Sequence, residues 1–143
     1  MGLRATWQNG GAGQSNGGSG PMAWAASYVP DKATVVVNGS GRLGFEDMKR
    51  IAMGATDLLH ENKASRLLLD CSEAFLDVKV VDVFYLPECY SKVGVPRSAR
   101  IALVMPKRRQ SSVIYEFYET VCRNKGYLCR LFDSQQSAEQ WLR

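Results

Sequence analysis

Short aliphatic runs alternate with longer amphipathic stretches from Ala33 to the end of the chain. Each short run has the length of a buried strand, and in each longer stretch the apolar residues recur at helical spacing. Residues 45–62 show the helical pattern most plainly, with apolar side chains on one face and charged side chains on the other. The alternation predicts a single α/β domain in which helices pack on a sheet.

The pattern predicts the element order β-β-α-β-α-β-α-β-α, with an initial hairpin and a glycine-rich connection before the first helix. Pro87 lacks an amide hydrogen and is expected to kink or split the second helix, and Asp77 is expected to cap that helix. Right-handed crossovers make the later strands mostly parallel. Strands are expected at 22–29, 33–37, 66–71, 99–105 and 127–132, the connection at 38–44, and helices at 45–62, 78–93 and 110–125, with a short helix at the chain end.

The first 21 residues differ from the rest, because Gly, Asn, Gln and Ser dominate them. Such a segment buries too little apolar surface to offset its chain entropy, so 1–21 is interpreted as a flexible tail or linker and 22–143 as the domain. No stretch approaches the roughly 18 consecutive apolar residues of a membrane span. The start of the chain also lacks the apolar core of a signal peptide. We therefore expect a cytoplasmic protein without integral membrane association.

The net charge and the cysteine spacing indicate which partners and cofactors to expect. The net charge of +4 is milder and less clustered than that of a typical nucleic-acid-binding protein, so no nucleic-acid partner is expected. The four cysteines form no C-x-x-C pair, and His60 is the only histidine in the sequence. This is a poor ligand set for zinc, and the cysteines are interpreted as reduced thiols. No metal or other cofactor is expected.

The glycine-rich connection matches the pattern G-x-G-x-x-G from Gly39 to Gly44. The pattern alone is a weak signal for a dinucleotide site. Asp70, the next acidic residue that ends a strand, lies 26 residues beyond Gly44, whereas the spacing in dinucleotide-binding units is about 20. A flexible bend with positive φ angles is the favoured interpretation.

Two groups of residues are candidates for binding a small ligand. Lys107, Arg108 and Arg109 follow a strand and begin a helix, where free amides and the helix dipole favour an anion. Asp70 closes the central strand at the end where α/β sheets usually bind ligands. Tyr85 and Tyr118 belong to an aromatic set that could line an apolar pocket. The alternatives are a solvated rim for the basic residues and a core position for the tyrosines.

Several stretches resemble the SpoIIAA-like group of the STAS superfamily, which includes anti-sigma-factor antagonists and is distantly similar to Sec14-type carriers. The resemblance covers residues 22–143 and implies a single-domain fold with about five strands in a mixed sheet and helices mainly on one face. The stretches that carry it are Val35–Val37 with Gly41–Leu43, Glu46–Asp47, Arg66–Asp70, Arg100–Val104, Arg130–Asp133 and Ala138–Leu142.

The resemblance also suggests where a partner would bind. Antagonists of that superfamily carry a regulatory serine directly after an aspartate at the start of the second helix. Asp77 matches the aspartate, but Val78 takes the place of the serine. We therefore expect a non-catalytic regulatory module, monomeric or homodimeric, that binds a protein partner through Asp77, Val78 and Lys79. The alternatives are a carrier or sensor of a small apolar or anionic ligand and, third, a small nucleotide-binding or hydrolytic enzyme.

Overall fold

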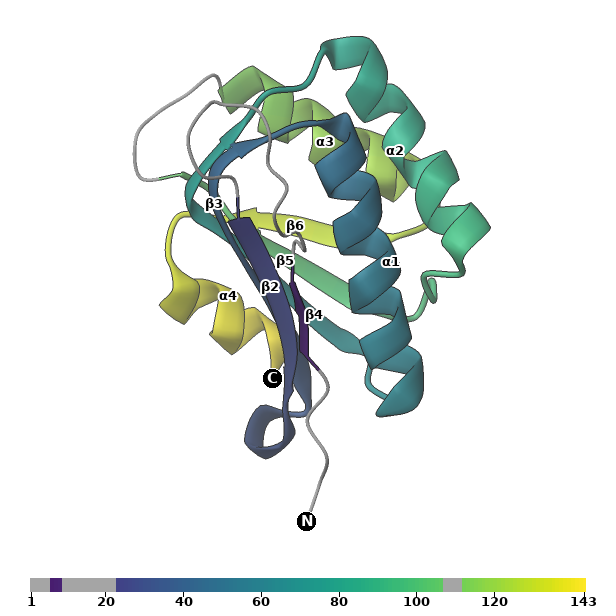
Figure 1. Cartoon of the computed structure of the whole chain (residues 1–143), viewed down its shortest axis with the longest axis vertical. Helices are drawn as coiled ribbons and strands as arrows, with labels where there is room; N and C mark the ends of the chain where they lie inside the picture. Colours follow the sequence, from purple (N-terminus) through teal and green to yellow (C-terminus); the bar gives the residue numbers. More distant parts are fainter. Residues whose placement is uncertain (1–5, 9–22, 107–111) are drawn as a thin grey trace.

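The computed structural model describes residues 6–8, 23–106 and 112–143, which form one sheet and four α-helices. The strands lie side by side in chain order, β1-β2-β3-β4-β5-β6 (Figure 1). β1, β2 and β3 are antiparallel to one another, whereas β3, β4, β5 and β6 are parallel. The strands are β1 (Thr6–Gln8), β2 (Ala23–Val29), β3 (Thr34–Leu43), β4 (Arg66–Leu76), β5 (Arg100–Val104) and β6 (Leu128–Phe132). The predicted order of elements from β2 onward is confirmed.

β1 corrects the expectation for the start of the chain. Thr6–Gln8 pairs with Ala25–Ser27 of β2, so these three residues form a sixth, edge strand inside the segment that we interpreted as a tail. Composition gave no sign of this strand, because its neighbours in sequence are mostly glycine and small polar residues. The other residues of 1–21 lie outside the described part of the chain.

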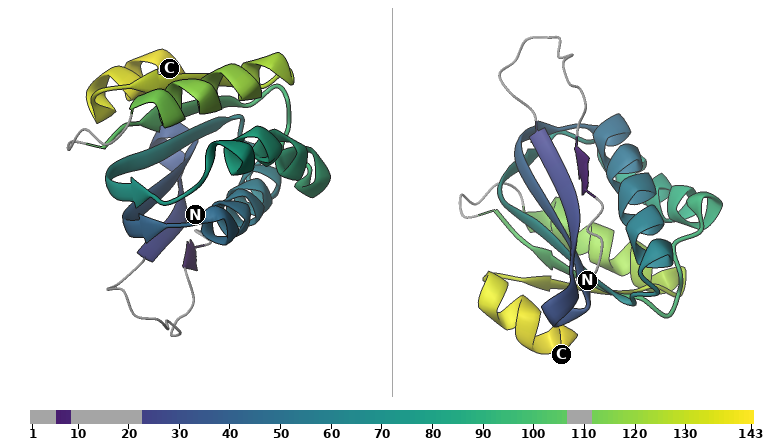
Figure 2. Two further views of the ribbon diagram at one scale, coloured as in Figure 1. Left: turned by 90° about the horizontal axis from the view of Figure 1, so that it is seen from above. Right: turned by 60° about the horizontal axis from the view of Figure 1, so that its bottom comes forward.

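The helices that connect the parallel strands cover one face of the sheet, and the last helix covers the other face (Figures 1 and 2). Because β3 to β6 are consecutive parallel neighbours, right-handed crossovers place every connecting helix on the same face. These helices are α1 (Phe45–Glu61), α2 (Val80–Val93) and α3 (Ser112–Asn124). α4 (Gln135–Leu142) follows the last strand and packs on the opposite face, over Leu68, Ala102 and Val104.

β3 and β4 are longer than the sequence predicted. The segment 38–44 was expected to be a connection, but β3 continues through Gly39 and Gly41 to Leu43 after a register shift between Asn38 and Ser40. β4 likewise continues beyond Cys71 to Leu76, so that Leu43 pairs with Leu76. Gly41 has a φ of 73°, which only glycine adopts readily. Gly39 and Gly41 of the G-x-G-x-x-G pattern therefore lie within a strand, and Gly44 is the N-cap of the helix that follows.

α2 also differs from its expected form. The helix begins at Val80 and passes through Pro87 as one element to Val93, so it is not split. Asp77 is not its N-cap: Lys79 is, and the Lys79 amide donates a hydrogen bond to Asp82 at 3.1 Å. The helix ends as predicted, at Gly94, whose φ is 89°.

The outer edge of β6 is partly protected by α3. The carboxylate of Glu119 accepts a hydrogen bond from the Leu131 amide at 3.1 Å. An edge strand that exposes unpaired amides can pair with another chain, and a charged side chain placed there discourages it. The sheet thus ends on this side at a strand whose backbone is engaged by its own domain.

Candidate docking surface

The three residues predicted to bind a partner lie together in the connection between β4 and α2. Asp77 is exposed and forms an ion pair with Arg42 of β3, with the Nη1 and Oδ2 atoms 2.7 Å apart. Val78 is half-buried against the main core, and Lys79 is exposed at the start of α2. The backbone is held here as well, because the Asp77 amide donates to the Leu43 carbonyl at 2.7 Å.

Directly after these residues, α2 exposes large apolar side chains. Val80 and Val81 are each 53% exposed, and Phe84 and Tyr85 are 50% and 49% exposed. Positions 80, 81, 84 and 85 share one side of the helix, because residues three and four apart are neighbours on its surface. The opposite side supplies the buried Val83, Leu86, Pro87 and Tyr90. α2 is thus apolar on both sides, although only one side faces the core.

Phe75, the residue before the last of β4, is 43% exposed and is stacked by Arg42, whose guanidinium lies 5.3 Å from the ring centroid. Arg42 therefore bridges the Phe75 ring and the Asp77 carboxylate. Phe84 and Tyr85 contact each other edge to face, with their ring centroids 5.5 Å apart. We call Val80, Val81, Phe84 and Tyr85 the α2 patch; Asp77, which is paired with Arg42, and Lys79 precede it in the chain.

The sequence placed the contact surface at Asp77, Val78 and Lys79, and the exposed apolar residues that follow them on α2 were not assigned to it. A signal was present: Val80, Val81, Phe84 and Tyr85 do not fall on the same helical face as Val83, Leu86 and Tyr90. A helix with two apolar faces must bury both or leave one to another molecule.

Among the residues proposed for a small ligand, the described ones lie in different surroundings. Tyr85 is exposed in the α2 patch, whereas Tyr118 is buried and its hydroxyl is hydrogen-bonded to that of Tyr90 at 2.8 Å. Asp70 lies within β4, half-buried, where one carboxylate oxygen accepts hydrogen bonds from the amide and hydroxyl of Ser72 at 3.0 and 2.7 Å. Lys107, Arg108 and Arg109 lie outside the described residues.

The cavity beside Tyr118 is small. Its volume is about 20 Å³, and α1, the sheet, Tyr90 and Tyr118 line it, but Tyr85 does not. One water molecule needs about 10–15 Å³ of such volume, so the cavity has room for one water and no organic ligand. Thr56 contributes a buried hydroxyl that has no hydrogen-bond partner among the described residues. Tyr85 and Tyr118 therefore do not share this cavity.

Burial keeps the side chains of Cys71, Tyr90 and Tyr118 in their neutral forms. Burial, with the neighbouring Asp70 charge, raises the pKa of the Cys71 thiol to about 12. Burial also raises the pKa values of Tyr90 and Tyr118 well above 10. Nucleophilic cysteine chemistry needs a thiolate, so Cys71 is inert near neutral pH. All four cysteines are free thiols.

The described residues contain neither a metal-binding cluster nor a membrane-spanning helix. Among them, no group of three or more His, Cys, Asp or Glu side chains is placed to hold a metal ion. Within the same ranges, no helix has the length and apolar character that crossing a bilayer requires.

No model of a protein family matches the chain, and no curated protein matches it either. The chain is similar to a solved structure of an uncharacterized protein of the DUF3478 family with a SpoIIAA-like fold, from Shewanella loihica PV-4. The TM-score is 0.54 at 15% identity, and the match covers 90% of this chain and 100% of the other.

Two further structures are more distant. The anti-sigma factor antagonist SpoIIAA in its unphosphorylated form gives a TM-score of 0.45 at 13% identity, covering 78% of this chain and 91% of that one. The Bacillus cell fate determinant SpoIIAA in the phosphorylated form gives 0.46 at 12% identity, covering 78% and 93%. The likeness to the DUF3478 protein, together with the topology, shows that this chain has a SpoIIAA-like fold.

Proposed function

We propose that this SpoIIAA-like chain is a non-catalytic regulatory module that binds a protein partner through the α2 patch and the adjacent Asp77, Val78 and Lys79. The observation that carries the proposal is the row of half-exposed apolar side chains on the outer side of α2. Exposed apolar groups that gather in one place, with charged residues around them, are typical of protein–protein interfaces.

The composition of the α2 patch supports a protein rather than a small ligand as its occupant. Two aromatic rings, Phe84 and Tyr85, stand next to each other on a helix that is anchored by its buried side. Aromatic side chains on a rigid element supply much of the binding energy in protein interfaces at little entropic cost. The charges of Lys79 and of the Arg42–Asp77 pair would then lie at the rim, where they affect the association rate and orientation.

Val78 is a poor position at which to test partner binding. Because Val78 is half-buried against the core, replacing it with lysine would disturb folding as well as binding. Phe84→Lys and Val81→Lys are better perturbations, since both side chains are about half exposed. Leu128→Lys is the matched control, because Leu128 is 49% exposed but lies on β6, away from the α2 patch.

The experiment attaches a photo-crosslinking side chain at Tyr85 and identifies the protein that it captures in cells of the source organism. The affinity of the purified pair is then measured for the wild type and the variants. We expect Phe84→Lys to weaken binding by about 30-fold or more, which corresponds to about 2 kcal/mol for an interface anchor. Leu128→Lys should leave the affinity within about twofold. Equal loss in both variants, or none in Phe84→Lys, would show that the partner binds elsewhere.

Self-association through the same surface is measured in parallel by sedimentation. If the wild type is a dimer and Phe84→Lys is a monomer, the partner at the α2 patch is a second copy of this chain. An unchanged dimer in Phe84→Lys would place the homodimer contact on another surface.

A further inference from the structure

A second concave site lies on the opposite face of the sheet, beside α4. Its volume is about 280 Å³, close to the lower limit of about 300 Å³ for ligand pockets. Four elements enclose it: the 3-10 turn η2 (Pro30–Lys32) between β2 and β3, the first residues of β3, the first residues of β4, and the C-terminal half of α4. We call it the α4 groove.

The α4 groove combines an apolar floor with a charged rim. Val36, Leu68 and Leu142 supply the floor, and Leu68 and Leu142 are almost fully buried. The charged side chains that line it are Asp31, Lys32, Arg66, Glu139 and Arg143. Three of these five are cations, so the lining side chains carry a net positive charge. The shape and the floor suit a short hydrocarbon, and the excess charge suits an anion.

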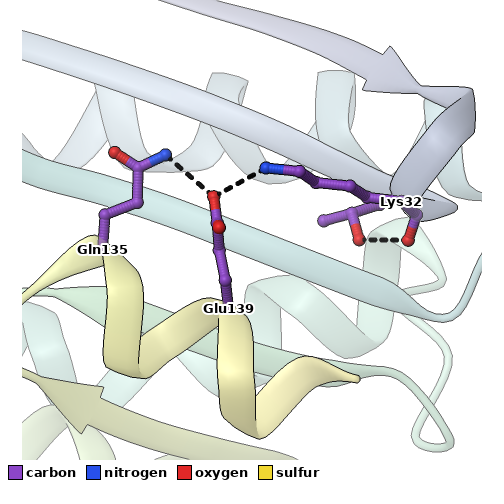
Figure 3. A network of polar contacts seen from close by, with 4 residues as sticks. Lys32, Gln135 and Glu139 are labelled. Atoms are coloured by element: carbon purple, nitrogen blue, oxygen red, sulfur yellow. Dashed lines mark hydrogen bonds and ion pairs between the residues drawn. The ribbon is translucent and has the colours of Figure 1, made fainter.

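One wall of the α4 groove already holds a carboxylate. The Oε2 atom of Glu139 accepts hydrogen bonds from Lys32 Nζ at 3.0 Å and from Gln135 Nε2 at 3.1 Å (Figure 3). These contacts lower the pKa of Glu139, with the Lys32 hydrogen bond as the largest cause. The contact joins η2 to α4. It also pairs the positive charge of Lys32 with Glu139, so that Lys32 is not free to bind an anion.

Arg66 is one of the two lining cations, with Arg143, that form no ion pair among the described residues. Its Nη1 atom donates to the Lys32 carbonyl at 3.3 Å, and it has no acidic partner among the described residues. This hydrogen bond places the guanidinium at the wall of the α4 groove, and within the described ranges no other side-chain bond of Arg66 is present, which leaves its other N–H groups available there. A guanidinium offers a fork of donors that matches the two oxygens of a carboxylate.

We propose that the α4 groove binds a small monocarboxylate with a short apolar chain, its carboxylate on Arg66 and its chain on Val36, Leu68 and Leu142. This site is separate from the α2 patch, which lies across the sheet, and the proposal does not depend on the protein-binding function. Binding of an amine in place of a carboxylate would meet the net positive charge of the rim, and a neutral analogue would leave the Arg66 fork unmatched.

The test titrates hexanoate, hexanamide and hexylamine into the ¹⁵N-labelled protein and follows the amide chemical shifts of the lining residues. We expect saturable shifts at Val36 and Leu142 with hexanoate, and at least about tenfold weaker binding of hexanamide and hexylamine. The proposal would be overturned if hexanoate caused no saturable shifts up to about 10 mM, a concentration that corresponds to a binding free energy of about 3 kcal/mol. Equal binding of the acid and the amide would also overturn it.

Two variants locate the carboxylate. Arg66→Gln should weaken hexanoate binding at least about tenfold while leaving hexanamide unchanged. Arg50→Gln is the control, because Arg50 is exposed on α1 across the sheet and should leave both titrations unchanged. Hexanoate binding that survives Arg66→Gln would overturn the assignment. The comparison of acid and amide in the wild type decides the charge requirement even if Arg66→Gln lowers stability.

Discussion

The hydrogen bond between Tyr90 and Tyr118 allows a quantitative test of how the helical face is held together. The two hydroxyl oxygens are 2.8 Å apart, and the residues, 5% and 2% exposed, join α2 to α3. Tyr118→Phe removes one hydroxyl and leaves the Tyr90 hydroxyl buried without its partner. An unsatisfied buried polar group costs about 1–3 kcal/mol. The lost hydroxyl volume, roughly 10–15 Å³, adds only about 0.3 kcal/mol.

The same reasoning predicts strong non-additivity. Tyr90→Phe should cost a similar free energy, but the double variant leaves no unpaired hydroxyl and should cost no more than either single change. The coupling free energy of the cycle is then about −1 to −3 kcal/mol. Urea unfolding followed by circular dichroism measures each value, and an unchanged m-value shows that the midpoint reports stability.

Tyr85→Phe provides the matched control, because it removes the same atom from a half-exposed tyrosine. Its effect should stay within about 0.5 kcal/mol. Additive costs in the Tyr90 and Tyr118 cycle would refute the reasoning, because they would mean that each hydroxyl finds another partner, such as a water beside Thr56, when the first is removed.

Three smaller predictions concern caps, turns and pH. Ser134→Ala should cost about 1 kcal/mol in urea unfolding, because Ser134 caps α4 by accepting from the Ser137 amide; no loss would contradict that role. Gly126→Ala should cost about 1 kcal/mol or more, since φ is 92° there. The stability of the fold should decrease from pH 9 to 10 by up to about 1.4 kcal/mol, because unfolded Cys71 loses a proton that the folded thiol keeps to about pH 12. Cys71→Ala should reduce that slope, and an unchanged slope would exclude Cys71 as its source.

The order of the elements was predictable because it rests on local patterns. The runs at Arg66–Leu69 and Arg100–Val104 are aliphatic on both faces of the strand, as expected for strands covered by helices on both sides. α1 carries its apolar side chains at helical spacing, and most of them enter the main core. These features can be recognised without knowing which distant residues each element contacts.

The long ends of β3 and β4 were not predictable because each depends on the other. Glycine is rare in strands, and Ser72 and Glu73 are weak strand formers, so local propensity favoured loops. The pairing of Ser40 with Glu73 and of Arg42 with Phe75 supplies the missing stabilisation. Sequence patterns do not specify the register in which two strand ends pair. For this reason Asp77 was predicted to cap the helix, whereas it forms an ion pair with Arg42.

The candidate docking residues were predictable only in part. The resemblance to SpoIIAA-like proteins pointed to Asp77, Val78 and Lys79, and these residues border the α2 patch. Tyr85 was interpreted as lining an apolar pocket or as a core residue, because hydrophobicity alone does not tell a buried face from an exposed one. Exposure became evident only when the buried side of α2 was known.

The chain-order arrangement of the strands has a consequence for synthesis on the ribosome. In the described residues, every strand pairs only with strands adjacent in sequence, so no part of the sheet waits for a segment made much later. The loops closed by β3–β4, β4–β5 and β5–β6 pairing are of similar length, and each is closed largely by one helix that covers the growing sheet. The domain can therefore grow strand by strand from the amino-terminal side as it emerges. α4 comes last, and only then do Leu68, Ala102 and Val104 lose their contact with water.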